Sequence, residues 1–62
     1  MCTFKVKVTP NNNRLAEMGL VKGTTFRIVK RVSGMIQLRL NGSDIVIREK
    51  LFKEIDYDKH ID

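Results

Sequence analysis

A helix-to-strand corner at residues 15–24, Leu-Ala-Glu-Met-Gly-Leu-Val-Lys-Gly-Thr, constrains the fold more than any other stretch of this chain. Leu15 and Met18 are three residues apart, so they share one face of a helix. Gly19 stands where a helix ends in a residue with positive φ. In that kind of ending Leu20 and Leu15 occupy positions that commonly touch. The stretch therefore predicts a short helix with a specified end, followed by a strand.

Alternation between apolar and polar residues predicts several short strands around this corner. We expect strands over residues 3–8, 24–32, 35–40, 44–48 and 55–57, a helix over 12–18 and one helical turn over 49–53. The start of the helix stays open, because Thr9-Pro10 and the three asparagines that follow can each begin it.

The same alternation assigns side chains to the inner face of the predicted strands. Phe4, Val6 and Val8 are expected to point to the core in the first strand. In the longest strand Lys30 interrupts the inward pattern near the strand end.

Tight turns connect these strands and indicate the fold class. Gly23 is predicted to take a positive φ in the turn before the second strand, as is Gly42 in the Asn41-Gly42 hairpin. Ser33-Gly34 predicts a second tight hairpin. We therefore expect a mainly β chain, a small SH3-like barrel of about five strands that closes on itself, with one short α-helix after the first strand. An OB-like barrel also fits, but the short meander over residues 24–48 favours the SH3-like form.

Three segments resemble the FeoA family in their order and spacing. They are Arg14-Leu15 with Met18-Gly19-Leu20 and Gly23-Thr24, the basic-ended strand 26–31, and residues 45–52 with their Arg-Lys-rich helical turn. The resemblance covers roughly residues 14–55. It implies an SH3-like domain that serves as a cytosolic accessory of the FeoB ferrous iron transporter. It also implies an alternative, in which the chain is a stand-alone relative of the C-terminal domain of iron-dependent repressors.

Length and composition limit the remaining possibilities. The chain has 62 residues, so we expect one domain over residues 1–62. Its one cysteine, Cys2, excludes an intramolecular disulfide and favours a reducing cytoplasm. No apolar run approaches the length of about 20 residues that spans a bilayer, so we expect membrane contact only through a partner. The sequence shows no nucleophile–base pair and no glycine-rich phosphate loop, so we expect no enzyme and no cofactor.

The net charge of +5 raises the alternative of a nucleic-acid-binding barrel. The basic residues expected on outer strand positions are Lys5, Lys7, Arg27, Arg31, Arg39 and Arg48. Barrels that bind nucleic acid normally add stacking aromatic residues. This chain has four aromatic residues, and Phe4 and Phe26 are expected in the core. We therefore expect a solvated basic face and no specific binding of nucleic acid.

The C-terminal residues alternate between acidic residues and histidine. Asp56, Asp58, His60 and Asp62 would share one face of an extended strand, and such side chains can bind divalent metals. Asp58 and His60 are the weak candidates. Chain termini are usually solvated, and the iron association of the family does not make this a metal site, so we expect none.

Five residues are candidates for a surface that binds a protein partner. They are Arg14, Glu17, Met18, Lys50 and Phe52, which together mix charge with apolar area. Leu15, Leu20 and Leu51 can satisfy the core in their place. The resemblance implies that the partner is the cytosolic part of a FeoB-type transporter. A homo-oligomer is left open.

Overall fold

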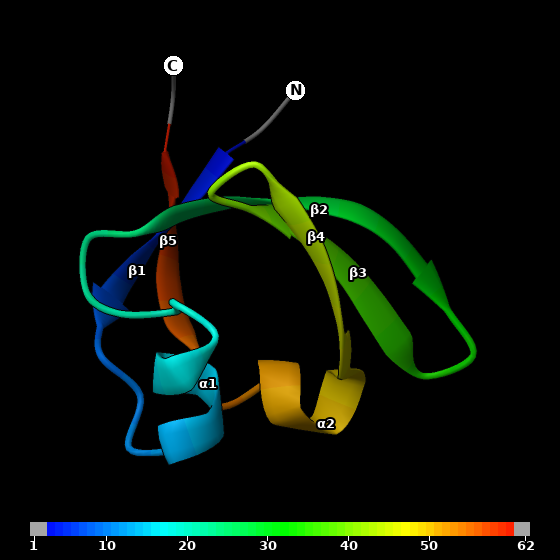
Figure 1. Cartoon of the computed structure of the whole chain (residues 1–62), viewed down its shortest axis with the longest axis horizontal. Helices are drawn as coiled ribbons and strands as arrows, with labels where there is room; N and C mark the ends of the chain where they lie inside the picture. Colours follow the sequence, from blue (N-terminus) through cyan, green and yellow to red (C-terminus); the bar gives the residue numbers. More distant parts are fainter. Residues whose placement is uncertain (1–2, 61–62) are drawn as a thin grey trace.

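The structure, a computed structural model, describes residues 3–60, so Cys2 and Asp62 lie outside the described part (Figure 1). The elements in chain order are β1 (Thr3–Val8), α1 (Asn13–Glu17), β2 (Thr25–Val32), β3 (Met35–Leu40), β4 (Ser43–Arg48), α2 (Glu49–Phe52) and β5 (Asp56–His60). All strand pairs are antiparallel and form one sheet in the order β4-β3-β2-β1-β5. The mainly β, SH3-like fold with a short helix after the first strand is confirmed.

The sheet is an incomplete barrel. Within residues 3–60 the edge strands β4 and β5 do not pair with each other. Figure 1 shows the sheet curving over α1 and α2, which lie on its open side. Leu15 of α1, Leu20 after it and Phe52 of α2 are buried in the core. The prediction of a barrel that closes on itself is therefore wrong, because helical side chains fill the space between the two edges.

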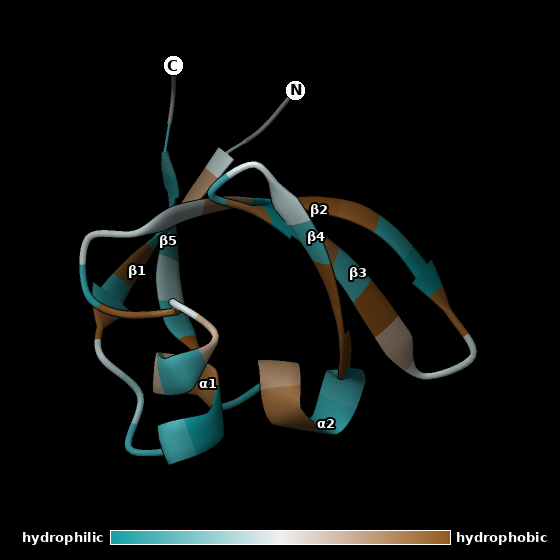
Figure 2. Cartoon of the chain, in the orientation of Figure 1, coloured by the Kyte–Doolittle hydropathy of each residue, from teal (hydrophilic) through white to brown (hydrophobic). Residues whose placement is uncertain are grey.

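The hydrophobic core draws on nearly every element. Its buried members are Val6, Leu15, Leu20, Phe26, Ile36, Leu38, Leu40, Ile47, Phe52 and Ile55. Figure 2 shows hydrophobic residues concentrated along the strands and on α2, whereas much of α1 is hydrophilic. Phe26 lies among three other aromatic rings, those of Phe4, Phe52 and Tyr57, at centroid distances of 5.6, 6.1 and 5.6 Å. Aromatic contacts of this kind dominate the energetics of a core this small.

Helix α1 ends as the sequence predicts. It begins after Asn12, whose side-chain oxygen accepts a backbone N–H of the first turn. At the other end the N–H of Leu20 donates to the carbonyl of Leu15, and the N–H of Gly19 donates to the carbonyl of Ala16, both at 3.0 Å. Gly19 has φ +100°. These two bonds define a Schellman ending, which fixes the direction in which the chain leaves the helix.

The predicted turns are also confirmed. Asn41 and Gly42 have φ of +51° and +80°, and Ser33 and Gly34 have φ of +49° and +77°. Positive φ at both central residues is the type I′ turn, whose twist matches that of the strands it joins. Gly23 has φ +90° in the turn before β2.

Two register shifts change which side chains face inward. One lies between Val6 and Val8 in the β1–β5 pair, and the other lies between Ile28 and Lys30 in the β2–β3 pair. An extra residue in one strand reverses the alternation beyond it. Val8 is consequently 57% exposed, so the prediction that it points to the core is wrong. The second shift explains why Lys30 interrupts the inward pattern.

Candidate protein-binding site

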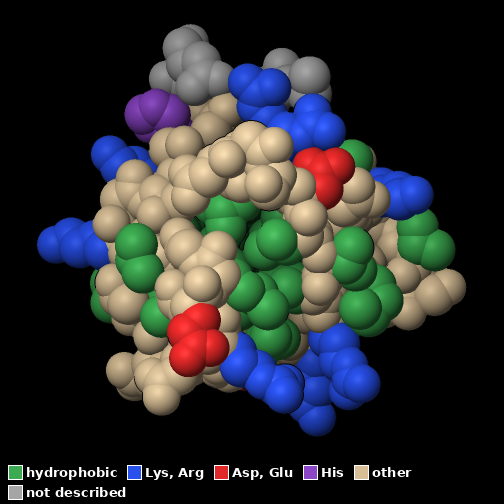
Figure 3. Space-filling model, viewed as in Figure 1, with side chains coloured by type: hydrophobic (Ala, Val, Ile, Leu, Met, Phe, Trp, Pro, Cys, Tyr) green, Lys and Arg blue, Asp and Glu red, His purple; other side chains and the backbone are tan. Residues whose placement is uncertain are grey.

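A groove of about 390 Å³ lies beside β4, on the open side of the sheet. The side chains that line this β4 groove come from α1, β3, β4 and α2: Arg14, Glu17, Met18, Met35, Val46, Ile47, Arg48 and Leu51. Figure 3 shows hydrophobic side chains gathered in a hollow at the centre of this face, with basic side chains along its lower side. Four elements therefore build one surface feature.

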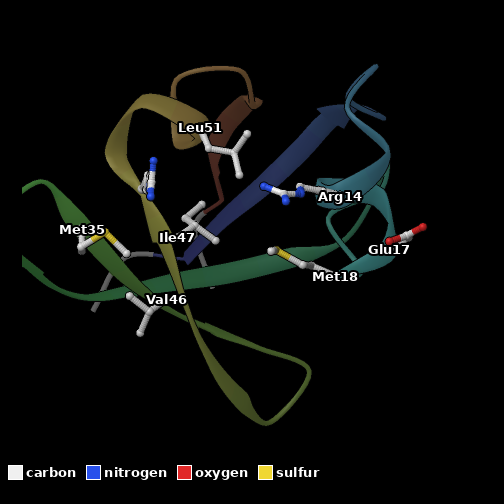
Figure 4. A pocket seen from close by; sticks show the side chains of 8 residues that line it. Arg14, Glu17, Met18, Met35, Val46, Ile47 and Leu51 are labelled. Atoms are coloured by element: carbon white, nitrogen blue, oxygen red, sulfur yellow. The ribbon is translucent and has the colours of Figure 1, made fainter.

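The groove extends around the edge strand. In Figure 4, Met35 and Val46 lie on one side of β4, whereas Leu51, Met18 and Arg14 lie on the other. Met18, Met35 and Val46 are 38%, 37% and 57% exposed. Single exposed apolar residues are common on protein surfaces, but three around one hollow form a patch that suits a partner.

The rim of the groove is basic. Arg14 and Arg48 line it, and both also line an adjoining hollow of about 320 Å³ together with Lys50, Leu51 and Glu54. The side chain of Glu17, the one acidic residue among those that line the groove, points away from the hollow in Figure 4. An occupant of the groove therefore meets more positive than negative charge.

The structure brings together four of the five residues predicted for partner binding. Arg14, Glu17 and Met18 line the groove, and Lys50 lines the adjoining hollow.

Phe52 does not join them. It is 4% exposed, and its ring centroid lies 5.3 Å from that of Tyr57. The prediction that Phe52 is exposed is therefore wrong. In the single turn of α2 it is Phe52 that faces the aromatic core, while Leu51 is half-buried and lines the groove.

Met35 and Val46 line the groove but were not among the predicted site residues. Val46 carried a signal, because it is an apolar residue at an outward position between the inward Ile45 and Ile47. Met35 directly follows the hairpin at Ser33-Gly34, and it faces Arg48 across the β3–β4 pair. That register is a tertiary property that no local pattern in the sequence specifies.

The weak metal candidates do not form a site within the described chain. Asp58 and His60 are exposed on β5, and the carboxylate of Asp58 lies 3.8 Å from the Nζ of Lys7. Between Thr3 and His60, no three acidic, cysteine or histidine side chains come together as metal ligands.

Several residues of the predicted basic face are engaged by acidic neighbours, and Arg31 among them faces the Ile36 side of the sheet beyond the register shift, not the outer side that the sequence predicted. Arg39 donates from Nε to Oδ1 of Asp44 at 2.8 Å, and Gln37 donates to Oδ2 of the same carboxylate at 3.0 Å. The hydrogen bond from Arg39 lowers the pKa of Asp44 and raises that of Arg39. Arg31 donates to Glu49 at 3.3 Å. Three cations of the predicted basic face, including Lys7, thus have acidic partners, and the aromatic rings that could stack on bases lie in the core cluster.

None of the helices within residues 3–60 has the length and apolar composition needed to span a bilayer. Comparison with protein families matches the FeoA domain over residues 5–57, a range that includes every residue lining the β4 groove. Searches of curated proteins and of solved structures gave no match.

Proposed function

This chain belongs to the FeoA family of small domains associated with ferrous iron transport, and we propose that it binds the cytosolic part of a FeoB-type ferrous iron transporter. It acts in the cytoplasm as an accessory, by protein–protein contact and without chemistry or a cofactor of its own. Its contact with the membrane is indirect, through the transporter.

The β4 groove is the observation that carries this proposal. It combines partly exposed methionine and valine side chains with a rim of arginine and lysine. Arginine and methionine are enriched at protein interfaces, and a desolvated apolar centre with a polar rim is the usual anatomy of such a contact. An open hollow of this kind suits a protein surface better than an enclosed small-molecule site, which normally buries most of its ligand.

Binding of the transporter's cytosolic part to single-residue variants tests the proposal. Met18→Asp places a charge in the groove and should weaken binding, by about tenfold or more, because the carboxylate would be desolvated against apolar side chains. Val21→Asp is the matched control, since Met18 and Val21 are each 38% exposed and Val21 does not line the groove. Lys5→Asp and Lys7→Asp should also leave binding unchanged.

Circular dichroism must show that each variant is folded before binding is compared. Equal affinity of the Met18→Asp and Val21→Asp variants would show that the groove is not the contact. Absence of binding by the parent chain to the transporter of its own organism would refute the proposed function.

A further inference from the structure

The backbone of β4 has an unpaired edge that faces the β4 groove. The N–H of Glu49 donates to the carbonyl of Gly34 at 2.8 Å, which fixes the phase of hydrogen bonding between β3 and β4. In an antiparallel pair the bonded positions recur at every second residue. Ser43, Ile45 and Ile47 are therefore the β4 residues that bond to β3.

The alternate residues Asp44 and Val46 direct their N–H and C=O groups away from β3. No backbone partner for either residue occurs in the described part of the chain, because β4 is the last strand of the sheet. Val46 is 57% exposed and stands at the middle of this edge. The edge thus offers regularly spaced donors and acceptors next to an apolar hollow.

The two edges of the sheet differ in how they are protected. Natural proteins commonly place charged residues along an exposed edge to prevent pairing with another chain. β5 follows that rule, with the sequence Asp-Tyr-Asp-Lys-His. The middle of β4, Ile45-Val46-Ile47, carries no charge. Asp44 and Arg48 flank this apolar middle, and an exposed strand edge with an uncharged middle beside a groove is an arrangement that can accept an added strand.

We propose that β4 accepts an extended acidic segment of a protein partner as an additional antiparallel or parallel strand. Apolar side chains on one face of the segment would contact Met18 and Leu51, and carboxylates on its other face would meet Arg48, which stands opposite Met35. Charge complementarity selects this occupant, because the groove rim is basic and its one acidic side chain points away. The proposal rests on the proposed function only for the identity of the protein that carries the segment.

A second copy of the chain is the competing occupant, and it suits the edge less well. Antiparallel pairing of two β4 strands about Val46 would set Asp44 opposite Arg48 of the other copy. The carboxylate of Asp44 is already held by Arg39 at 2.8 Å and by Gln37 at 3.0 Å. Two copies would also bring together two rims of the same positive charge.

A blocked seven-residue peptide of alternating glutamate and valine is the probe. Its binding to the chain is measured by NMR titration, and the amide signals of Asp44, Val46 and Arg48 should shift. The same peptide with lysine in place of glutamate is the charge control, and it should bind at least about tenfold more weakly. Equal binding of both peptides would overturn the choice of an acidic segment.

Val46→Pro tests the backbone contact. Proline removes the outward N–H of Val46 without breaking a bond to β3, and an edge strand tolerates it there. We expect Val46→Pro to weaken binding of the glutamate peptide about tenfold, the loss expected for one hydrogen bond. Val46→Thr, which keeps the N–H, should bind within about threefold of the parent. Equal affinity of the proline variant and the parent would overturn the added strand.

Methylation of the peptide backbone gives a test that leaves the protein unchanged. Two versions of the glutamate peptide are made, one with N-methyl groups on its even-numbered residues and the other with N-methyl groups on its odd-numbered residues. Only the set whose N–H groups face β4 should lose affinity, because successive residues of a strand point to opposite sides. Equal loss for both sets would show that the peptide is not bound as a strand.

Three further outcomes separate this inference from its alternatives. Concentration-dependent dimers of the parent that Val46→Pro abolishes would show that a second copy occupies the edge, and would overturn the proposal. Equal binding of the transporter's cytosolic part to the parent and to Val46→Pro would refute the added strand but leave the proposed function standing. Peptide binding that depends on Val46, without any binding to the transporter, would support the strand site and refute the proposed function.

Discussion

The guanidinium of Arg31 lies over the ring of Phe52, with Cζ 5.9 Å from the ring centroid. The same guanidinium donates to Glu49 at the start of α2. The single turn of α2 is thus stabilised by two sets of contacts. The ring of Phe52 packs in the aromatic core, and Arg31 of β2 contacts both that ring and Glu49. Cation–aromatic contacts at such partly exposed sites contribute about 0.5–1 kcal/mol.

Phe52→Ala should therefore act on folding and not selectively on binding. Truncation of a buried phenylalanine costs about 3 kcal/mol or more. That is a large part of the total free energy of unfolding expected for a chain of this length, roughly 3–9 kcal/mol. Lys50→Ala, on the same turn but exposed, should stay within about 0.5 kcal/mol of the parent. Urea denaturation measures both values. Similar midpoints for the two variants would contradict the buried position of Phe52.

Gly19→Val should destabilise the chain by more than about 1 kcal/mol, because a β-branched residue resists positive φ. A Cβ at this position would meet Leu40 Cδ2 at 3.6 Å and Asn41 Nδ2 at 3.5 Å, which are ordinary contacts. The loss therefore comes from the backbone at φ +100° and not from a clash. Lys22→Val, in the exposed loop that follows, is the control. Urea midpoints that agree between the two variants would show that the ending of α1 tolerates a side chain.

Acid should remove the contribution of the Arg39–Asp44 pair to stability. The hydrogen bond from Arg39 lowers the pKa of Asp44 in the folded chain. A carboxylate whose pKa is lowered on folding contributes stability above its unfolded pKa and loses it as the pH falls through the folded pKa. Because both side chains are exposed, the effect should be small and sensitive to salt.

Arg39→Gln should raise the pKa of Asp44, which NMR titration of the side-chain carboxyl carbon follows directly. At neutral pH the free energy of unfolding of Arg39→Gln should be lower than that of the parent. This difference should vanish in acid, below the lowered pKa of Asp44. Lys30→Gln removes a charge without touching this pair and should leave the pKa of Asp44 nearly unchanged. A pKa of Asp44 that is the same with and without Arg39 would contradict the assigned cause.

Nucleic acid should bind weakly and lose affinity steeply with salt. Three cations of the predicted basic face pair with acidic neighbours, and the aromatic rings pack in the core or against it. Fluorescence anisotropy with single-stranded and double-stranded DNA and RNA measures this. An affinity tighter than about micromolar that survives about 0.2 M salt would favour the nucleic-acid-binding function instead.

The features that the sequence predicted correctly depend on local backbone rules. Gly19 and the pair Asn41-Gly42 have conformations that only a few residue types adopt readily, so their places could be read directly. The end of α1 followed from the positions of Leu15 and Leu20 relative to Gly19. These positions also belong to the segments that resemble the FeoA family, and the family match over residues 5–57 confirms that resemblance.

The features that were missed depend on how the elements meet. The register shift that exposes Val8 inserts one residue into β1 without a glycine or proline to mark it. Leu51 and Phe52 are adjacent and both apolar, and a single helical turn is too short for periodicity to say which is buried. The open side of the barrel depends on the volume of α1 and α2 beneath the sheet, which no pattern along the chain reports.

The order of the strands also predicts an order of folding. β2, β3 and β4 are joined by two-residue turns, whereas β1 pairs with β5 from the opposite end of the described chain, with Thr3 opposite His60. Loop-closure entropy rises with the length of chain between paired segments, so we expect the meander to form early and β5 to dock late. Substitutions at Asn41-Gly42 should accordingly slow refolding in a chevron experiment, while those in β5 should mainly accelerate unfolding.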